Sequence, residues 1–434
     1  MRTLSLTTLL SFVVACGDDG STTDTTTTDT TDAPEPTDTT DTTDTTEPLV
    51  DCDSPGQICT VVGQPGSAQF SAVGIPASEG SLYLVQDVSF GPDGTMYILD
   101  FNNHRILKVG GDGILRLVTG TGMLGDGPEG SAFNAAWNHP TNMAFNPLEP
   151  NVLYVAAWHN SRINAIDLVA NTLDWRVGTG GRIYTDGVDQ AVAGLDLPAG
   201  IVFDEDGTLY IMDQANQVIR EVGADGIIHT IAGTAPTVVA GVTTARFAGY
   251  AGDGGAAIGA RFHASVGQAA DPSSRMELKD GLLYVVDTDN HMVRYVDLAA
   301  STVDRFAGTY VENPADSTPG DWSIDNLPAL GGYAGDGGPA LDAQLNGPRD
   351  IAFGLDGELY IADTLNNCVR VVDTAGNIDT FAGTCDALLP GSDGEGVPAT
   401  DALLHKPYGV TVDPATGDVY ISDTYNHTIR RVAH

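Results

Sequence analysis

The stretch that decides the fold reads Leu359-Tyr360-Ile361-Ala362-Asp363-Thr364-Leu365-Asn366-Asn367-Cys368-Val369-Arg370. Apolar residues surround a tyrosine, an aspartate ends the run, and a short polar loop leads into a second apolar run. The pattern recurs along the chain around a set of tyrosines: Tyr97, Tyr154, Tyr210, Tyr284, Tyr360 and Tyr420. Their spacings of 57, 56, 74, 76 and 60 residues indicate a repeated unit that is padded by loops of different lengths.

Each repeat is predicted to contain four short antiparallel strands, A to D. Strand A covers residues 87–91 in the first unit and 350–354 in the fifth, and Asp-Gly turns follow it. Strand B carries the tyrosine, strand C covers 369–372 in the fifth unit, and strand D covers 380–384. No helical period appears, so the class predicted is an all-β, six-bladed propeller of four-stranded blades, with the tyrosines packed between blades.

The sixth repeat lacks a strand D, because the chain ends at His434 directly after strand C. Ahead of the first repeat, however, Ile58-Cys59-Thr60-Val61-Val62-Gly63 has the pattern of the other D strands. We therefore expect this N-terminal strand to pair with strand C of the last blade and close the ring. Ile58, Val61 or both should be buried there.

The stretch quoted first resembles an NHL repeat, and residues 419–430 do so as well. Two identical segments, Gly-Tyr-Ala-Gly-Asp-Gly-Gly at 249–255 and 332–338, are similar to loops of bacterial and teneurin-like NHL propellers. The resemblance covers nearly all of the chain after residue 53. The second repeat departs from it at Ala157-Trp158, and residues 271–281 are interpreted as an insertion between strands A and B of the fourth repeat.

The first 16 residues are typical of a bacterial lipoprotein signal. Arg2 and an apolar stretch over 4–14 precede Val13-Val14-Ala15-Cys16, which predicts lipidation of Cys16 and anchoring in the cell envelope, in the outer membrane or at the cell surface. The alternative is an ordinary cleaved signal. Residues 17–53 hold twelve acidic residues and no Lys or Arg, so they are predicted to form a disordered Thr/Asp-rich tether, with the propeller over 54–434.

The charge narrows the classes of partner. Without the tether and Arg2, −28 of the formal net charge of −39 remains, and such a surface repels nucleic acid and anionic lipid. Membrane contact is therefore expected through the lipid anchor only. The chain has no phosphate-loop, His-Glu-x-x-His or Gly-x-Ser-x-Gly motif, so familiar nucleotide and hydrolase chemistry is unsupported.

Antiparallel strands place the B–C loops and the D–A connections on one face of the propeller, called here the loop face. We predict that this face binds a protein, peptide or glycan, and that Trp158→Ala weakens binding without unfolding the protein. The alternative is that the polar residues only satisfy their own turns. The candidate residues are Asp100, Asn103, His104, Trp158, His159, Asp213, Asn216, Asp287, Asn290, His291, Asp363, Asn366, Asp423, Asn426 and His427.

At the start of strand A the six repeats align Asp87, Asn142, Gly200, Gly267, Asp350 and Gly409. Asp87, Asn142 and Asp350 present oxygen atoms that suit calcium, although no cofactor is required by the pattern. A metal-dependent propeller enzyme of the lactonase or lyase type is thus the first alternative function, and a structural envelope component is the second. The purely structural alternative is that this position tolerates small or turn-forming residues.

Four cysteines remain after Cys16 and allow three pairings in an oxidising compartment. Cys368 opens strand C and Cys385 follows strand D of the same blade, so the C–D hairpin brings them nearly opposite each other. Cys52 and Cys59 are then expected to form the second disulfide.

Overall fold

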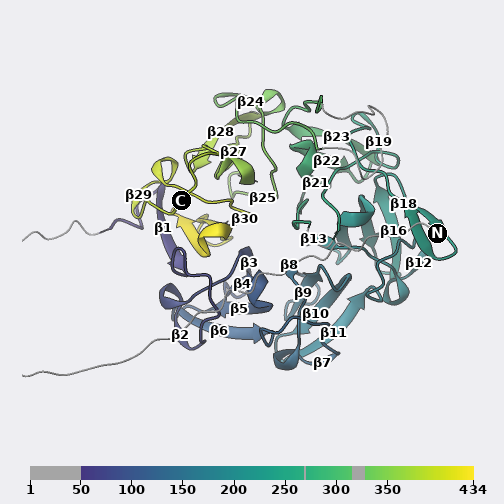
Figure 1. The fold of residues 1–434 in the computed structure, drawn as a ribbon, viewed down its shortest axis with the longest axis horizontal. Coiled ribbons are helices and arrows are strands. Elements are labelled where there is room, and N and C mark those ends of the chain that lie inside the picture. Colours follow the sequence, from purple (N-terminus) through teal and green to yellow (C-terminus); the bar gives the residue numbers. More distant parts are fainter. Residues whose placement is uncertain (1–49, 268–269, 315–327) are drawn as a thin grey trace, which may run out of the picture. The chain divides into compact units, whose positions relative to one another are not determined.

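Alternating apolar and polar residues turn each repeat into one antiparallel sheet, and six sheets surround a central axis in the computed structural model (Figure 1). The structure describes residues 50–267, 270–314 and 328–434. The predicted signal segment, Cys16 and most of the tether lie outside these residues. The folded unit begins at Val50 rather than at residue 54, because Cys52 is bonded to Cys59 and Asp53 pairs with Arg431 (2.6 Å).

Three strands of each blade follow the predicted order outward from the axis. The A strands of neighbouring blades contact one another around the axis. They are β3 (Val85–Phe90), β8 (Pro140–Phe145), β13 (Pro198–Phe203), β20 (Met276–Lys279), β25 (Asp350–Phe353) and β30 (Gly409–Val412). The B strands are β4 (Met96–Asp100), β9 (Val152–Ala157), β14 (Leu209–Asp213), β21 (Leu282–Asp287), β26 (Leu359–Asp363) and β31 (Val419–Asp423). The C strands are β5 (Arg105–Val109), β10 (Arg162–Asp167), β15 (Val218–Val222), β22 (Met292–Asp297), β27 (Cys368–Val372) and β32 (Thr428–Val432).

The N-terminal strand closes the ring as predicted. The D strands are β6 (Ile114–Thr119), β11 (Thr172–Val177), β16 (Ile227–Ala232), β23 (Thr302–Ala307) and β28 (Asn377–Ala382), and β1 (Gln57–Val62) supplies the sixth. β1 pairs with β32 in the last blade, where the two ends of the folded unit lie side by side (Figure 1). A bulge at Val61 shifts the register, so Ile58 and Val62 are buried and Val61 is only half-buried.

Each sheet has a fifth strand that sequence reasoning missed. Before it reaches the axis, each D–A connection pairs two residues with the outer edge of the next D strand, and this pairing covers the edge. These strands are β2 (Ile75–Pro76), β7 (Gly130–Ser131), β12 (Val188–Asp189), β19 (Gly255–Ala256), β24 (Gly338–Pro339) and β29 (Val397–Pro398). Turns of 3₁₀ helix follow five of them: η1 (Ala77–Glu79), η3 (Ala132–Asn134), η4 (Gln190–Val192), η7 (Ala340–Asp342) and η9 (Ala399–Asp401).

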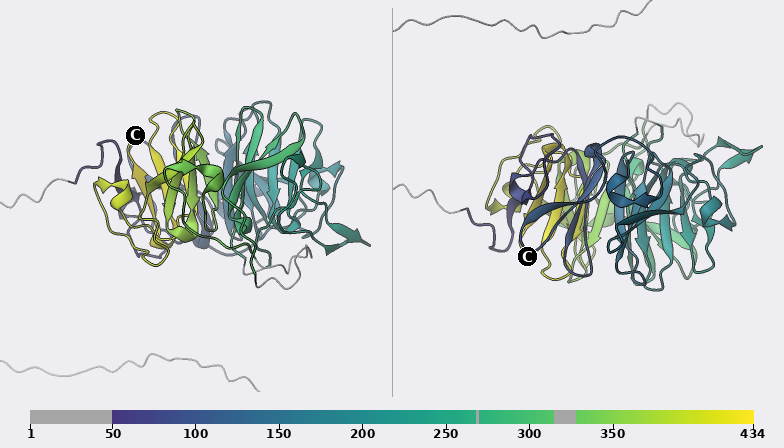
Figure 2. Two further views of the ribbon diagram at one scale, coloured as in Figure 1. Left: turned by 90° about the horizontal axis from the view of Figure 1, so that it is seen from above. Right: turned by 90° about the horizontal axis from the view of Figure 1, so that it is seen from below.

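Five B–C turns also contain one turn of 3₁₀ helix. They are η2 (Phe101–Asn103), η5 (Gln214–Asn216), η6 (Thr288–Asn290), η8 (Thr364–Asn366) and η10 (Thr424–Asn426). A separate hairpin, β17 (Thr237–Val239) and β18 (Val242–Ala245), projects from the rim of the ring (Figures 1 and 2). Within the described part of the chain, no helix is long and apolar enough to span a bilayer.

The repeat tyrosines pack between blades, as predicted. Tyr97 meets Phe145 of the next A strand edge-on at 5.3 Å, and Tyr154 meets Phe203 in the same way at 4.8 Å. Tyr420 of the last blade meets Phe90 of the first at 5.1 Å, so this contact also crosses the point of closure. Edge-to-face aromatic contacts of this kind add to the burial that holds neighbouring sheets together.

The fourth blade corrects the predicted alignment. Residues 276–279 are its A strand, so the long insertion precedes strand A instead of separating strands A and B. Asp280 and Gly281 form the A–B turn with φ values of 51° and 76°, which Asp and Gly adopt in tight hairpins. Gly267 therefore lies in the D–A connection and not at the start of the strand.

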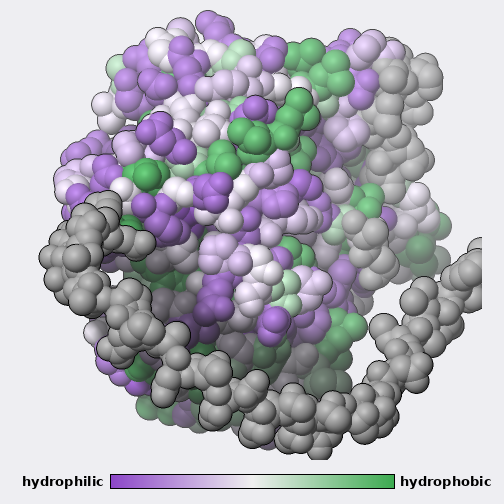
Figure 3. Space-filling view, turned by 60° about the vertical axis from the view of Figure 1, so that its left-hand side comes forward, coloured by the Kyte–Doolittle hydropathy of each residue, from purple (hydrophilic) through white to green (hydrophobic). Residues whose placement is uncertain are grey.

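Both predicted disulfides are present. Cys52 bonds to Cys59, with Cα atoms 5.6 Å apart, and Cys368 bonds to Cys385, with Cα atoms 4.9 Å apart. On the face drawn in Figure 3, hydrophilic side chains dominate and apolar ones form scattered groups. This distribution fits the strongly acidic composition.

Candidate functional site

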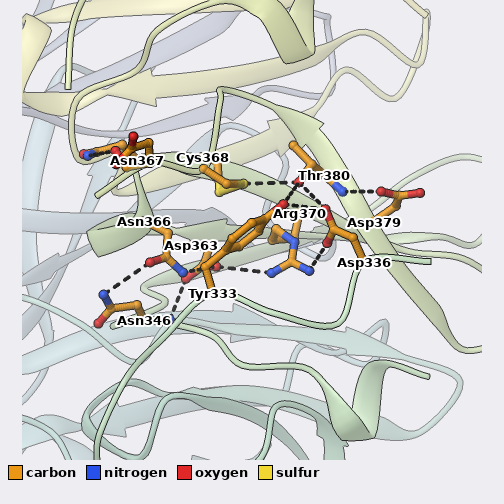
Figure 4. The surroundings of a disulfide bond; sticks show 12 residues. Tyr333, Asp336, Asn346, Asp363, Asn366, Asn367, Cys368, Arg370, Asp379 and Thr380 are labelled. Carbon is orange, nitrogen blue, oxygen red and sulfur yellow. Dashed lines mark hydrogen bonds and ion pairs between the residues drawn. A yellow bond between two sulfur atoms is a disulfide. The ribbon is translucent and has the colours of Figure 1, made fainter. Parts of the chain in front are cut away.

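The B–C turns are held by aspartates that point into the protein. In the fifth blade Asp363 accepts hydrogen bonds from the backbone N–H of Asn346 (2.7 Å) and from Asn366 Nδ2 (2.8 Å). Arg370 Nη1 lies 3.6 Å from the same carboxylate (Figure 4). Burial raises the pKa of Asp363 to about 6, and the bonds from Asn346, Asn366 and Arg370 limit the rise, so the carboxylate is ionised at neutral pH.

Ten of the polar residues predicted to bind a partner are buried and bonded within their own turns. Their exposed fractions are 0–6%, and each Asn Nδ2 donates to the Asp three residues earlier. A buried, internally bonded side chain cannot reach a partner. The ten are Asp100, Asn103, Asp213, Asn216, Asp287, Asn290, Asp363, Asn366, Asp423 and Asn426.

The glycine-rich loops also have an internal role. Arg370, which is fully buried, joins Asp363 to Asp336 of the second glycine-rich segment, and the ring of Tyr333 covers its guanidinium at 4.9 Å (Figure 4). Arg294 joins Asp287 to Asp253 of the first segment in the same way. The glycine-rich loops therefore neutralise buried arginines, which leaves these carboxylates engaged within the blade.

The second blade is the exception among the B–C turns. Ala157 replaces the aspartate, and Asn160 Oδ1 accepts the equivalent backbone bond from Asn138 (3.0 Å). The turn carries Trp158 and His159, whose rings stack at 4.2 Å. Trp158 is 1% exposed and belongs to a large apolar cluster, so we expect Trp158→Ala to destabilise the fold rather than leave it intact. Such a truncation costs about 3–5 kcal/mol.

Three other predicted histidines contact the protein itself. His291 Nδ1 accepts from the N–H of Gly347 (2.8 Å), and its Nε2 lies 2.8 Å from the carbonyl oxygen of Ala329. His427 Nδ1 accepts from the N–H of Leu84 (3.1 Å). His104 is half-buried against the edge of another histidine ring. All three hold connections on the loop face.

On the axis, a guanidinium occupies the place predicted for calcium. Arg275 Nη1 lies 3.1 Å from Asp87 and 2.7 Å from Asp350, and its Nη2 donates to the carbonyl oxygens of Gln86 and Thr141, both at 2.7 Å. The chain thus supplies the cation between these carboxylates. No cluster of three or more His, Cys, Asp or Glu suited to a metal ion occurs in residues 50–267, 270–314 and 328–434.

The residues at three other aligned positions, Asn142, Gly200 and Gly409, are explained by their contacts around the axis. Asn142 donates to Asp87 (3.0 Å) and is therefore part of this network. A Cβ on Gly200 would lie 3.0 Å from Arg275 Cα, and one on Gly409 would lie 2.6 Å from the carbonyl oxygen of Gln86. Glycine at these two positions is therefore required by the close approach of the strands around the axis.

Two cavities lie close to the axis. The A strands enclose a channel of about 210 Å³, whose lining includes Glu277 and Asp350. Burial, and then the charge of Asp350, raises the pKa of Glu277 to about 8, so its carboxyl group is mostly protonated at neutral pH. Sequence reasoning missed Arg275 and Glu277 because it assigned their strand to an insertion. The Asp280-Gly281 turn just ahead of Tyr284 was the available signal.

The second cavity is a recess of about 140 Å³ on the loop face, and we call it the axial recess. The backbone N–H of His159 donates to the carbonyl of Asn138 (3.2 Å), so the B–C turn and the D–A connection meet there, as predicted. Four aromatic side chains gather with polar ones in the wall. The lining includes Leu84, Gln86, Phe101, His139, Trp158, His159, Asp271, Pro272, Tyr408 and Tyr425.

Only two of the predicted binding residues in the described part of the chain line the axial recess, namely Trp158 and His159. His139 Nδ1 lies 3.0 Å from His159 Nδ1 and 2.9 Å from Asn138 Oδ1. Burial lowers the pKa of His139 and of His159 to about 4, with neighbouring cationic groups adding to the effect, so both rings are neutral at pH 7.

A six-bladed ring of four-stranded units with an extra edge strand, closed by its N-terminus and recessed on one face, defines a six-bladed β-propeller. The family model described as the Teneurin NHL domain matches residues 55–246 and 277–390, and the NHL repeat model matches residues 404–432. The chain belongs to the Teneurin NHL domain family.

Curated relatives are similar over most of this chain. NHL repeat-containing protein 2 of Gallus gallus is 28% identical over 350 residues, which cover 77% of this chain and 44% of the relative. Teneurin-m of Drosophila melanogaster is 27% identical over 369 residues, which cover 79% of this chain and 12% of the relative. The chain thus spans less than half the length of either relative.

Solved structures share the fold at low sequence identity. An auxiliary nutrient binding protein from Bacteroides thetaiotaomicron has a TM-score of 0.56 and 13% identity, with 86% of this chain and 75% of that chain covered. A protein of unknown function from the same organism has a TM-score of 0.58 and 13% identity, with 87% and 75% covered.

Proposed function

We propose that this propeller is a binding protein whose ligand, a protein, peptide or glycan, enters the axial recess. The observation that carries the proposal is the composition of the recess, where aromatic side chains and polar groups from blades far apart in the sequence converge on the axis. The nutrient binding protein of similar fold supports a binding role for such a propeller. The surface charge favours a neutral or cationic ligand.

We also propose that the propeller is displayed on the cell envelope through a lipid on Cys16, a residue outside the described part of the chain. The two disulfides support an oxidising compartment, because such bonds are rare in the cytosol. Cys16→Ser should release the protein from membranes into the soluble fraction. Retention of the Cys16→Ser protein in washed membranes would contradict the anchor.

The binding proposal is tested by a ligand screen on the full chain. Ligands that bind only the native state raise the melting temperature by mass action, so panels of peptides and oligosaccharides can be ranked by the shift they cause. Tyr425 lines the recess, whereas Leu355 is 56% exposed in an A–B turn on the opposite face. Tyr425→Ala should abolish the ligand-induced shift, and the control Leu355→Ala should retain it. The reverse result would place the site on the other face.

A further inference from the structure

Two tryptophans of one apolar cluster are equally buried but differ in hydrogen bonding. Trp137 and Trp158 are each 1% exposed. Trp137 Nε1 donates to Thr119 Oγ1 (3.2 Å), whereas Trp158 Nε1 has no acceptor among the described residues. A buried donor without a partner costs about 1–3 kcal/mol. Because Trp158 lines the axial recess, a ligand in the recess is the natural source of an acceptor.

His159 contributes a second unpartnered polar atom to the same wall. Its Nε2 is buried and has no partner among the described residues. The Nδ1 atoms of His139 and His159 lie 3.0 Å apart, and Asn138 Oδ1 lies 2.9 Å from the first and 3.3 Å from the second. This contact occupies His159 Nδ1. Nε2 is a donor in one tautomer of the neutral ring and an acceptor in the other, and a ligand hydroxyl, which both donates and accepts, suits either form.

Gln86 adds a group that can both donate and accept. It is 2% exposed and lines the axial recess. Its backbone carbonyl accepts from Arg275, which leaves its side-chain amide as the group of Gln86 that can serve a ligand. A ligand that carries acceptors alone would leave the amide of Gln86 partly unsatisfied. Hydroxyl groups, which donate and accept, satisfy all three side chains.

Size and charge limit the ligand further. A recess of about 140 Å³ is smaller than the roughly 300–1,000 Å³ of pockets that enclose a drug-sized molecule, so it takes one small ring of a larger ligand. The charge on Asp271 is paired with Arg349 (3.0 Å), and the charge on Arg275 is paired with Asp87 and Asp350. The recess is therefore close to neutral, and its aromatic walls suit an apolar ring face.

We infer that the axial recess binds one uncharged sugar ring of a glycan, with a ring or hydroxyl oxygen accepting from Trp158 Nε1 and hydroxyl groups paired with His159 Nε2 and Gln86. The C–H face of the sugar packs against the aromatic wall. This inference rests on the proposed function and names its ligand class. A carboxylate-bearing ligand is disfavoured, because the net charge of the surrounding surface repels it.

The test observes the indole N–H directly. The full chain, which has four tryptophans, is labelled with ¹⁵N-tryptophan and titrated with neutral methyl pyranosides in one arm and with uncharged capped aromatic peptides in the other. Trp158→Phe assigns the Trp158 resonance while keeping a large apolar ring. The expected result is a saturable shift of the Trp158 Nε1–H with a sugar, and none at Trp137. Trp158→Phe should weaken sugar binding about 3–10-fold, the loss of one hydrogen bond.

Trp175, which is 37% exposed on β11 and lines neither cavity, supplies the control, and Trp175→Phe should leave affinity unchanged. A Trp158 shift with the peptides alone would overturn the sugar assignment and leave the proposed function standing. Sugar binding, seen as a higher melting temperature, without a Trp158 shift would overturn the assignment of the recess. No response to either probe class would overturn the inference and the proposed function together.

Discussion

Loss of the N-terminal strand should cost most of the stability of the propeller. Ile58 and Val62 are fully buried in β1, and each contributes about 1.5–3 kcal/mol by burial. Gly56 N donates to the carbonyl of Ala433 (2.8 Å), Gly396 N donates to that of Ile58 (2.8 Å), and each bond adds about 0.5–1.5 kcal/mol. With the β1–β32 ladder, the expected loss is about 6–10 kcal/mol, against about 5–15 kcal/mol for a typical domain.

The assay compares the free energy of unfolding in urea for a chain that begins at Leu49 and one that begins at Gln69. The first should match the full chain, and the second should be largely unfolded or aggregated because a sheet edge is exposed. Ile58→Ala, which keeps the Cys52–Cys59 disulfide, should cost about 2–5 kcal/mol. Val50→Ala, at a residue 60% exposed, should change stability by under about 0.5 kcal/mol. Equal free energies of unfolding for the chains that begin at Leu49 and Gln69 would refute closure of the ring by β1.

Three further changes test the axis and the last disulfide. Arg275→Met leaves two buried carboxylates without their cation and should lower the free energy of unfolding by about 3–5 kcal/mol. Adding Asp350→Asn should recover part of this loss. A loss below about 1 kcal/mol would contradict the ion pair. The pKa of Glu277 is about 8 in the folded state, against 4.5 ordinarily. Between pH 4.5 and pH 8 the folded state therefore holds a proton that the unfolded state has lost. The free energy of unfolding falls as the pH rises through this range, by at most about 1.4 kcal/mol per pH unit. Urea unfolding at pH 5 and pH 8 should show that Glu277→Gln reduces the pH dependence of stability, with buried aspartates such as Asp363 accounting for the rest. An unchanged dependence would argue against a protonated Glu277. Replacing Cys368 and Cys385 together by Ser should lower stability by about 2–4 kcal/mol in the same assay, and an unchanged midpoint would deny the disulfide a stabilising role.

The fold was predictable where local chemistry repeats. The tyrosine of strand B recurs in all six repeats, the aspartate after it in five and an Asp-Gly turn before it in four, and these features set strand length and direction. The β1 strand was predictable because an open sheet edge needs a partner. The predicted position of strand A in blade four was wrong. The actual strand, Met276–Lys279, lines a polar channel and contains charged residues, so it lacks the apolar pattern of an A strand.

The candidate site was predictable only in part. Trp158 and His159 stood out because they break the turn pattern, and they do line the recess. Their burial was not predictable, because it depends on Phe101 and other residues of adjacent connections. Gln86 and Tyr408, which lie more than 300 residues apart in the sequence, share the recess only because the ring closes. No local sequence motif predicts that Gln86 and Tyr408 lie together.

The polar residues of the B–C turns show why repetition misled the assignment of function. Asp363 and Asn366 look like an exposed polar loop, but the same pair also satisfies the interior of a turn. A residue type that recurs in five blades is better explained by a need that these blades share, which here is the neutralisation of a buried arginine such as Arg370. The break in the pattern at Trp158 was the more informative signal.

The most direct test of the central claim is a crystal structure of the protein with the tightest ligand from the screen. We expect a ring of the ligand in the axial recess, with one of its oxygen atoms within about 3.2 Å of Trp158 Nε1. A ligand found instead in the channel beside Glu277, or at the rim near β17 and β18, would contradict it.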